Sequence, residues 1–484
     1  MADTPILDYG RPPLKWYQGL DRYCWIVLAI AALGWLFDTM DQNLYNLVRP
    51  ASMRQLLRPE FTNPITKVVN EVALAADANQ KGAWLNAIFL LGWAVGGFVF
   101  GVLGDRMGRV KTMVTTILIY AIFTGLSGLA WNWKIYAITR FLTAVGVGGE
   151  WAAGASLVAE VFPQRSRGMA LGSLQALSAL GNMMAAIITL ILGNLERYWP
   201  IAYFIGFLPG LLVFWILRSV KEPDAWVQAK ARASFGKELG AITELFTNRL
   251  VRRNSIIAIL LATAGVGGLW GIGFFSTNMV SDELRSAFNW AAMTPTQVDA
   301  ANQTIGRTIS VMFLIQQIGA FVGIYLFAIV AERVTRRAAF AIWFVLAWGF
   351  VLLFFWGLAG MGGKVFVLSL PLAFLLGFGT LGPFSGFSIY FPELFPTRLR
   401  TTGCGVGYNA ARVFAAPAAI MLGNLSKWFA TQGFAGGKSF AMAASTVSAI
   451  YAVGLIALIF APETKGKGLP EDSVFETATG TEKA

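Results

Sequence analysis

The chain contains twelve long apolar stretches, and this succession is the feature that most limits how it can fold. A helix needs about 20 apolar residues to cross the hydrocarbon core of a bilayer, and each stretch is close to that length. With 56% hydrophobic and only 13% charged residues, the chain has more apolar surface than a water-soluble protein could bury. The sequence therefore predicts an all-α membrane protein with spans near residues 24–48, 83–103, 112–130, 135–159, 168–193, 199–218, 255–280, 306–330, 338–359, 365–391, 402–426 and 439–461.

The basic residues are unevenly divided between the two sides of these spans. Of 38 Lys and Arg residues, 24 fall on one side, 11 on the other and 3 (Arg140, Arg307 and Arg412) within spans. Because positively charged loops stay in the cytoplasm, the richer side, with both termini and the segment 218–254, is expected there. The net charge of +12 then needs no nucleic-acid partner. Arg140 and Arg307 lie toward outer span ends, where their side chains are expected to snorkel to the interface.

Residues for covalent or metal chemistry are scarce in this sequence. There are two cysteines, Cys24 and Cys404, and no histidine. No nucleophile arrangement, metal-ligand cluster or phosphate-binding loop is present, so we expect neither an enzyme nor a cofactor or metal site. The N-terminal residues lack the pattern of a cleaved signal peptide. Because the sequence has no histidine, any proton coupling must use carboxylates.

Two charged motifs each occur twice, in the same order. Asp105–Arg109 is matched by Glu332–Arg336 at an offset of 227, and Glu160–Arg167 is matched by Glu393–Arg400 at an offset of 233. Such repetition indicates a duplicated six-helix unit. We expect bundles at 1–217 and 255–462, joined by a cytoplasmic linker at 218–254 and followed by a cytoplasmic tail at 463–484. A duplicated transporter fold places its substrate near the midplane, between the halves.

These motifs carry a family resemblance over nearly the whole chain. The segment 101–109, GVLGDRMGR, resembles the signature between helices two and three of the major facilitator superfamily, although Val110 replaces a usual second basic residue. Gly148–Trp151, followed by 155–160, is similar to the sialate:proton and metabolite:proton symporter families, which include lactate/pyruvate permeases. The spacing of Asp38 and Asp41 is similar to the paired aspartates of sialate and aromatic-acid proton symporters. The segment Pro462–Gly466 resembles the sugar porters.

Three carboxylates are candidate proton sites. Asp38 and Asp41 share one stripe of the first helix with Tyr45, and two carboxylates so close in a poorly polar environment cannot both ionise easily. At least one is expected to hold a proton near neutral pH, and the sequence does not separate the two. Alternatively, they stay ionised and paired at a wet helix end. Glu150 follows a glycine stripe (146, 148 and 149) and is either a third proton site or a structural contact between helices.

Polar and aromatic side chains within the spans are candidate substrate contacts. Arg412 can form two parallel hydrogen bonds with a carboxylate, and Tyr408 and Asn409 lie within one turn of it. Alternatively, Arg412 pairs with a helix-one aspartate. Polar stripes can line a cavity or hold helices together, and aromatic residues can simply be packed. The further candidates for the substrate wall are Tyr45, Gln175, Ser178, Asn182, Gln316 with its neighbour Gln317, Trp270, Phe274 and Asn278.

The family resemblance also implies a cytoplasmic gate. In this interpretation, charged residues at the inner helix ends form ion pairs that close the inner side while the outer side is open. Single exposed pairs are weak, but a network can bias an equilibrium between two states. The expected gate residues are Asp105, Arg106, Arg109, Glu160, Arg165, Glu332, Arg333, Glu393 and Arg398.

Together these observations predict a twelve-helix, monomeric carrier in the cell membrane. We expect proton-coupled symport, by alternating access, of a small organic anion such as a monocarboxylate or acidic sugar. Its expected partners are that substrate, protons and the lipid bilayer. The alternatives are a carrier of uncharged sugars or polyols, an exporter of cations or drugs, and a nutrient receptor that does not transport.

Overall fold

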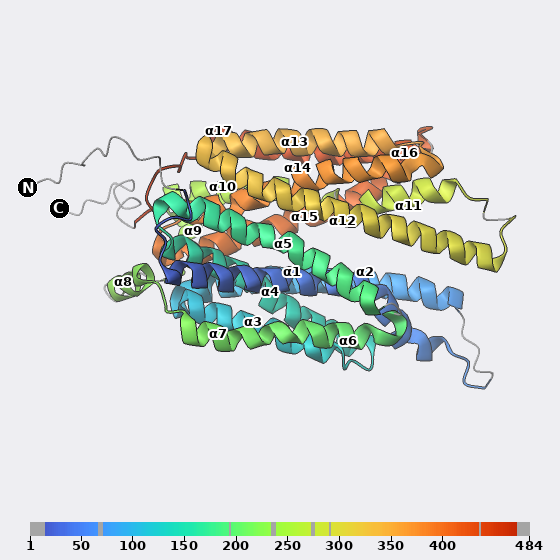
Figure 1. The fold of residues 1–484 in the computed structure, drawn as a ribbon, viewed down its shortest axis with the longest axis horizontal. Coiled ribbons are helices and arrows are strands. Elements are labelled where there is room, and N and C mark those ends of the chain that lie inside the picture. Colours follow the sequence, from blue (N-terminus) through green and yellow to red (C-terminus); the bar gives the residue numbers. More distant parts are fainter. Residues whose placement is uncertain are drawn as a thin grey trace, which may run out of the picture.

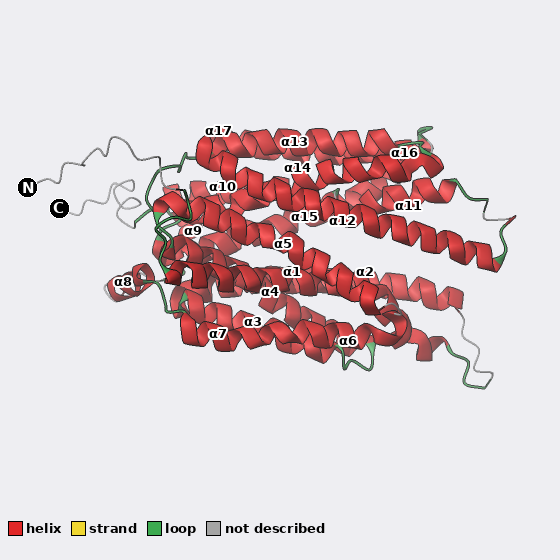
Figure 2. Ribbon diagram, viewed as in Figure 1, coloured by secondary structure: helices red, strands yellow, loops and turns green. Residues whose placement is uncertain are grey.

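The computed structural model describes residues 15–65, 71–192, 195–233, 239–272, 276–289, 292–434 and 437–471, with some side chains inside these ranges left out. Throughout the described part of the chain the regular elements are helices, which run roughly parallel along one long axis (Figure 2). This confirms the all-α prediction. Eleven helical stretches of the described residues are long and apolar enough to cross a membrane.

The first group of helices corresponds to the six predicted N-terminal spans. The sixth span is interrupted by the 3-10 turn η2 (Leu208–Leu211), because Pro209 has no N–H to donate to an α-helical bond. The bounds are α1 (Arg22–Leu57), α2 (Glu71–Met107), α3 (Arg109–Ser127), α4 (Trp133–Val161), α5 (Gln164–Leu192), α6 (Leu195–Phe207) and α7 (Leu212–Ser219).

The second group corresponds to the C-terminal spans. Its helix α15 matches the predicted span at 402–426 and is long enough to cross a membrane. The bounds are α10 (Arg249–Gly271), α11 (Ser276–Ser286), α12 (Pro295–Arg333), α13 (Arg336–Leu358), α14 (Val365–Leu394), α15 (Arg400–Thr431), α16 (Gly437–Ser448) and α17 (Ile450–Phe460).

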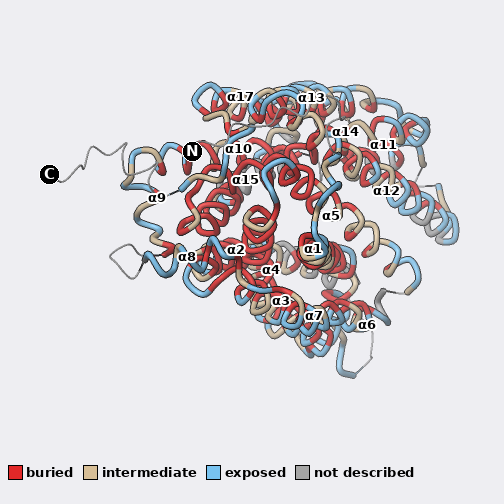
Figure 3. Tube along the Cα trace, turned by 60° about the vertical axis from the view of Figure 1, so that its left-hand side comes forward, coloured by how far each residue is buried: buried red, intermediate tan, exposed pale blue. Residues whose placement is uncertain are grey.

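The two groups form two bundles that face each other. In Figure 3 the N-terminal helices lie below and the C-terminal helices above, with buried residues concentrated where they meet. Two short helices of the connecting segment, α8 (Asp224–Ala233) and α9 (Glu244–Thr247), lie at one end of the molecule (Figure 1). We call this the linker end. The segment η5 (Gly362–Lys364) lies at the opposite end.

Two expected loops are partly helical. Between the predicted spans 24–48 and 83–103, α1 continues to Leu57, η1 covers Arg58–Phe61 and α2 begins at Glu71. Similarly, α10 begins at Arg249, so the non-spanning connection is shorter than 218–254. Both differences arise because polar residues can extend a helix beyond the bilayer without losing its backbone hydrogen bonds.

Glycines allow unusually close helix contacts. The predicted stripe on α4 serves two neighbours, because Gly146 faces α3 and Gly148 faces α2. A Cβ on Gly146 would lie 2.6 Å from the backbone nitrogen of Tyr120, and one on Gly148 would collide with the carbonyl of Trp93. The bundles also meet backbone to backbone at the linker end, where a Cβ on Gly405 would lie 2.6 Å from the carbonyl oxygen of Gly97. Such contacts replace side-chain packing in membrane proteins.

Candidate transport site

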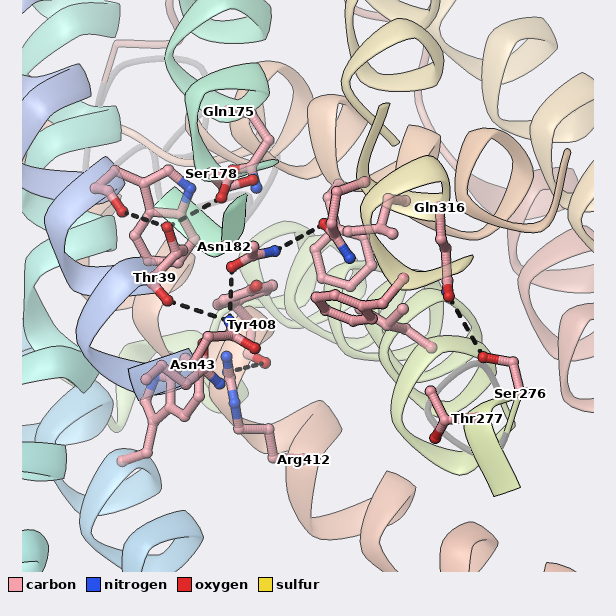
Figure 4. A pocket seen from close by; sticks show the side chains of 18 residues that line it. Thr39, Asn43, Gln175, Ser178, Asn182, Ser276, Thr277, Gln316, Tyr408 and Arg412 are labelled. Carbon is pink, nitrogen blue, oxygen red and sulfur yellow. Dashed lines mark hydrogen bonds between the residues drawn. The ribbon is translucent and has the colours of Figure 1, made fainter. Parts of the chain in front are cut away.

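A cavity of about 100 Å³ lies between the two bundles. Figure 4 shows side chains from α1 and α5 on one side and from the C-terminal bundle on the other, pointing into a common space. The position agrees with a substrate site shared by two repeats. The lining residues are Trp35, Thr39, Gln42, Asn43, Trp93, Gln175, Ser178, Asn182, Leu269, Ser276, Thr277, Phe313, Gln316, Gln317, Leu381, Phe384, Tyr408 and Arg412.

Arg412 brings a buried positive charge to this cavity. Its guanidinium lies between two aromatic rings, 3.8 Å from the ring centre of Trp93 and 4.4 Å from that of Tyr408. Its Nη1 donates to Asn409 Oδ1 at 2.9 Å, while its Nε has no hydrogen-bond partner among the described residues. The rings stabilise the cation and restrict its orientation. Because the described residues give it no ion pair, the arginine can accept an anion in the cavity.

Asp38 and Glu150 are buried carboxylates without hydrogen-bond partners among the described residues. Each is about 1% exposed, and all four carboxylate oxygens are unbonded. Gly34 of α1 makes room for Glu150 of α4, because a Cβ at Gly34 would collide with that carboxylate. Both Glu150 and Arg412 are close enough to interact electrostatically with Asp38. An unpaired carboxyl group is much cheaper to bury neutral than charged, so this pair has the properties of a proton site.

Asp41 is in a different environment, although it lies only one turn away. It accepts a hydrogen bond from Thr124 at 2.8 Å and lies 3.5 Å from Arg140 Nη1. The expectation that Arg140 snorkels is wrong, because its side chain is fully buried. Arg140 also donates to Ser127 at 3.0 Å and to Thr143 at 2.7 Å. The structure thus separates the two aspartates: Asp41 is paired and Asp38 is not.

A chain of amide side chains crosses the cavity from one bundle to the other. Asn43 of α1 donates to Asn182 of α5 at 2.6 Å, and Asn182 donates to Gln317 of α12 at 2.9 Å. Two further amides of the cavity lining are hydrogen-bonded within their own bundles. Gln175 accepts from Trp151 at 3.0 Å, and Gln316 accepts from Ser276 at 3.3 Å. Figure 4 shows the link through Asn43 and Asn182. These neutral groups join the halves without adding charge.

The predicted lining residues have different outcomes. The structure places Arg412, Tyr408, Gln175, Ser178, Asn182 and Gln316 together in the cavity lining, and Asn409 beside Arg412. Tyr45 is not in the lining: its hydroxyl donates to Asn86 at 2.9 Å and its ring stacks on Phe89. The expectation for Tyr45 is therefore wrong, because α1 turns it toward α2. The side chains of Trp270, Phe274 and Asn278 lie outside the described residues.

Several lining residues were missed from the sequence. Thr39, Gln42 and Asn43 form a polar stripe on α1, beside the stripe that contains the aspartates. Their spacing could have indicated a second polar face of α1. The aromatic residues Trp35 and Trp93 carry no comparable signal, because an apolar ring in a membrane helix is usually packed or lipid-facing.

At the linker end, the N-terminal motifs form a buried charge cluster that reaches the other bundle. Arg109 pairs with Asp105 at 3.0 Å and Glu160 at 2.9 Å. Glu160 also pairs with Arg400 of α15 at 2.5 Å. Asp105 accepts from the backbone N–H of Thr402 at 2.8 Å, so it caps the first turn of a helix in the opposite half. This cluster joins the two bundles directly.

The C-terminal copy of the motifs forms a cluster with different partners. Arg336 pairs with Glu332 at 3.0 Å and Glu393 at 3.1 Å. Thr464 donates to Glu393 at 2.6 Å, so the segment after α17 completes the cluster. Partial burial acts to raise the pKa of the Glu463 carboxyl, but the backbone N–H groups that donate to it, first that of Lys465, hold that pKa below its ordinary value.

The remaining predicted gate residues make other contacts. Arg106 donates to the carbonyl of Leu239 at 3.1 Å, and Arg165 donates to that of Gln18 at 2.5 Å. Arg398 pairs with Glu244 of the connecting segment. Arg333 accepts from Lys465 through its backbone oxygen at 2.9 Å. Besides Asp105, Arg400 bridges the bundles through its ion pair with Glu160; sequence reasoning quoted Arg400 in the repeat but did not select it. A second-repeat arginine facing the first repeat cannot be identified from spacing alone.

Two helical bundles with a polar cavity between them define a membrane transporter of the repeat-built class. The chain belongs to the Major Facilitator Superfamily, whose model matches residues 31–293. It is 28% identical to a probable 4-methylmuconolactone transporter of Cupriavidus pinatubonensis, over 90% of this chain and 89% of that protein. It is 26% identical to the sialic acid transporter NanX of Escherichia coli, over 69% and 75% of the two chains.

A solved structure supports the same fold. The proton:xylose symporter XylE, determined with a bromodeoxyglucose bound, superimposes with a TM-score of 0.64 over 94% of this chain and 99% of that one. Its sequence identity is 17%, so this likeness concerns the fold. The family and fold expected from the sequence are confirmed, and the protein is a transporter rather than an enzyme.

Proposed function

We propose that the protein is a proton-coupled symporter of a small organic anion, with the linker end in the cytoplasm. The observation that carries this proposal is the pairing of opposites at the cavity: Arg412 faces it with a charge that no described carboxylate neutralises, and Asp38 nearby has no partner. The orientation rests on the excess of 24 over 11 basic residues toward the linker side.

The lining supports a flat carboxylate better than a fully hydroxylated ligand. Trp35, Trp93 and Phe384 contribute aromatic surface, and the polar lining contacts are neutral amides and hydroxyls. A planar, unsaturated acid would use the rings for packing and Arg412 for its carboxylate. An acidic sugar would use more of the amides. The relatives named above are a transporter of 4-methylmuconolactone and one of sialic acid, so both types remain in the proposal.

Coupling would follow from electrostatics. With Asp38 or Glu150 ionised and Arg412 free, the carboxylates attract the arginine and compete with the substrate anion. A proton taken up by this pair removes the competition and leaves Arg412 available to the substrate. One proton and one monovalent anion together add no net charge, so the proton offsets the charge that the substrate brings and the centre can be enclosed at no extra cost in charge while the bundles rock. Release of both on the other side resets the carrier.

Transport of an uncharged sugar is the second candidate, because the segment Pro462–Gly466 resembles that of sugar porters. In this chain the segment holds the C-terminal charge cluster, far from the cavity. A buried arginine in the cavity is unnecessary for a neutral ligand and expensive in a membrane. The same positive charge disfavours a cation substrate.

Uptake by proteoliposomes tests the proposal. Vesicles with an acidic exterior are given radiolabelled benzoate, N-acetylneuraminate or xylose as probes, and uptake into protein-free vesicles, which benzoic acid can enter unaided, is subtracted. We expect uphill uptake of a carboxylate, abolished by a protonophore, and none of xylose. Uptake of xylose alone would favour the sugar carrier, and absence of any exchange would favour a receptor.

The role of Arg412 gives the sharpest variant. Arg412→Lys keeps the charge but loses the planar, two-bond geometry. Loss of one charge-assisted hydrogen bond costs about 1.5–3 kcal/mol, or roughly tenfold to a hundredfold in carboxylate affinity. Calorimetry in detergent at fixed pH measures this affinity. Unchanged binding by a folded Arg412→Lys variant would assign Arg412 a purely structural role.

A further inference from the structure

A second groove lies on the outside of the C-terminal bundle, at the linker end. It has a volume of about 640 Å³ and lies between the start of α10 and the end of α17. Figure 1 shows these two helix ends close together near the linker end, away from the space between the bundles. The groove is lined by Arg249, Leu250, Arg252, Arg253, Ile256, Ile257, Leu260, Ala457 and Phe460.

The polar part of this groove consists of arginines. Arg249, Arg252 and Arg253 are spaced to share one face of α10, and all three are exposed. Arg253 donates to the carbonyl oxygen of Phe460 at 3.1 and 2.7 Å, which fixes it at the end of α17. The hydrogen bonds and ion pairs of the described residues do not engage the side chains of Arg249 or Arg252. Among the described residues no acidic side chain lines the groove, so there its like charges are held together without compensation.

The rest of the groove is apolar and belongs to the membrane-spanning part. Ile256 is 47% exposed and Phe460 is 62% exposed, although both are large hydrophobic residues. Both lie within candidate membrane spans, Arg249–Leu269 and Gly437–Phe460. The groove therefore has a cationic mouth at the membrane interface and an apolar wall that continues into the bilayer. Its ligand must have both a negative group and a hydrocarbon chain.

The neighbouring groove on the other side of α17 provides a comparison. It contains one arginine, Arg337, which donates to the carbonyl of Leu458 at 3.0 Å, and one carboxylate, Glu463. Its cation is thus already used and its charge is balanced. Only the groove at α10 combines unengaged arginines with exposed apolar residues, among the described grooves at this helix end.

We propose that the groove between α10 and α17 binds an anionic phospholipid from the bilayer leaflet at the linker end. Arg249 and Arg252 would contact the phosphate and headgroup oxygens, and an acyl chain would lie along Ile256, Leu260 and Phe460. Basic pockets between helices on the cytoplasmic side attract anionic headgroups in this way. A free phosphate could use the arginines but would leave the apolar wall uncovered, so lipid is the occupant that both parts of the groove fit.

Native mass spectrometry and thermal unfolding test this proposal on the full chain. Delipidated protein in detergent is mixed with dioleoylphosphatidylglycerol, dioleoylphosphatidylcholine or inorganic phosphate. We expect phosphatidylglycerol to bind and raise the unfolding temperature, and the other two to have little effect. The variant Arg249→Gln/Arg252→Gln should bind phosphatidylglycerol roughly tenfold less tightly or worse.

Two control variants keep the result interpretable. Arg218→Gln removes a charge at the inner end of α7, outside this groove, and should retain full lipid binding. Arg249→Lys/Arg252→Lys preserves the positive charge needed for membrane insertion and should retain most of it. Equal lipid binding by the double glutamine variant would overturn the proposal. An equal stabilisation by inorganic phosphate would instead reveal a site for free anions and would also reject the lipid.

Discussion

Two of the arginines buried in the bundles, Arg140 and Arg412, contrast in their surroundings. Arg140 is enclosed by Asp41 and by the hydroxyls of Ser127, Thr124 and Thr143. Arg412 has two aromatic rings, one amide and an unbonded Nε at the edge of a cavity. The first arrangement pairs its opposite charges internally, at 3.5 Å between Arg140 Nη1 and Asp41 Oδ2, and these two atoms make no hydrogen bond among the described residues. The second leaves a cation and a nearby acid, Asp38, available to something that enters and leaves.

This difference matters because both arrangements have similar composition. Each is buried, and each combines an arginine of another helix with an aspartate of α1. In a low-dielectric interior, removing one partner of a satisfied pair leaves an uncompensated charge, whereas an unpaired group is costly from the start. We therefore interpret a buried charge with an ion-pair partner as structural, and a buried charge without one as functional. The two aspartates of α1 test this distinction in one helix.

The largest expected effect is that of Asp38→Asn. Because Asp38 is unpaired, its amide analogue should fold normally but be unable to take up a coupling proton. Uphill uptake driven by a pH gradient should be abolished, while counterflow exchange of substrate persists. Proteoliposome assays measure both. Retained accumulation in Asp38→Asn would transfer the proton site to Glu150, which Glu150→Gln would then reveal.

A smaller but distinct effect is expected for Asp41→Asn. Losing one partner of the buried Asp41–Arg140 pair should destabilise the protein by about 3–5 kcal/mol, seen as a lower unfolding temperature in detergent. The double variant Asp41→Asn/Arg140→Gln should lose less free energy of unfolding than the two single variants together, because it leaves no unpaired charge buried. Asp38→Asn is the matched control and should be no less stable than the parent. If Asp41→Asn unfolds at the parental temperature, the contrast between the two pairs fails.

The smallest effect should follow Gln317→Leu. This change removes one neutral hydrogen bond, from Asn182, and leaves the bond between Asn43 and Asn182 in place. A loss of about 0.5–1.5 kcal/mol corresponds to roughly twofold to tenfold in apparent substrate affinity. Coupling to protons should remain intact, as measured by the dependence of uptake on the pH gradient. Loss of coupling here would mean that the amide chain does more than join the halves.

The sequence was sufficient to predict features that have a characteristic length, such as membrane spans, and features that occur twice, such as the charged motifs. The spans followed from their apolar length and the duplication from two motifs at nearly one offset, whereas the family followed from the resemblance of residues 101–109 to a known signature. It was also sufficient to select Arg412, since a charge within a span is conspicuous. It could not separate Asp38 from Asp41, because that depends on which residue of α1 faces Arg140 of α4. Rotation of one helix against another leaves no mark in the spacing of either.

The same limitation explains the linker-end clusters. The two copies of each motif have similar residues, yet Glu160 reaches Arg400 in the opposite bundle while Glu393 binds Thr464 of its own half. From the sequence we predicted one gate containing residues of both copies, without separating the partners of each copy. The observed difference arises from the segment after α17, which occupies the second cluster.

The contact between Gly97 and Gly405 has a consequence for energy conservation. A carrier that harvests an ion gradient dissipates it whenever hydrated protons slip past an empty binding site. At the linker end the two bundles meet with backbone against backbone, in a space too small for even a methyl group. No file of water molecules fits through such a contact. The close approach at this point thus depends on two residues with no side chain, and a larger residue at position 405 would force the two bundles apart there.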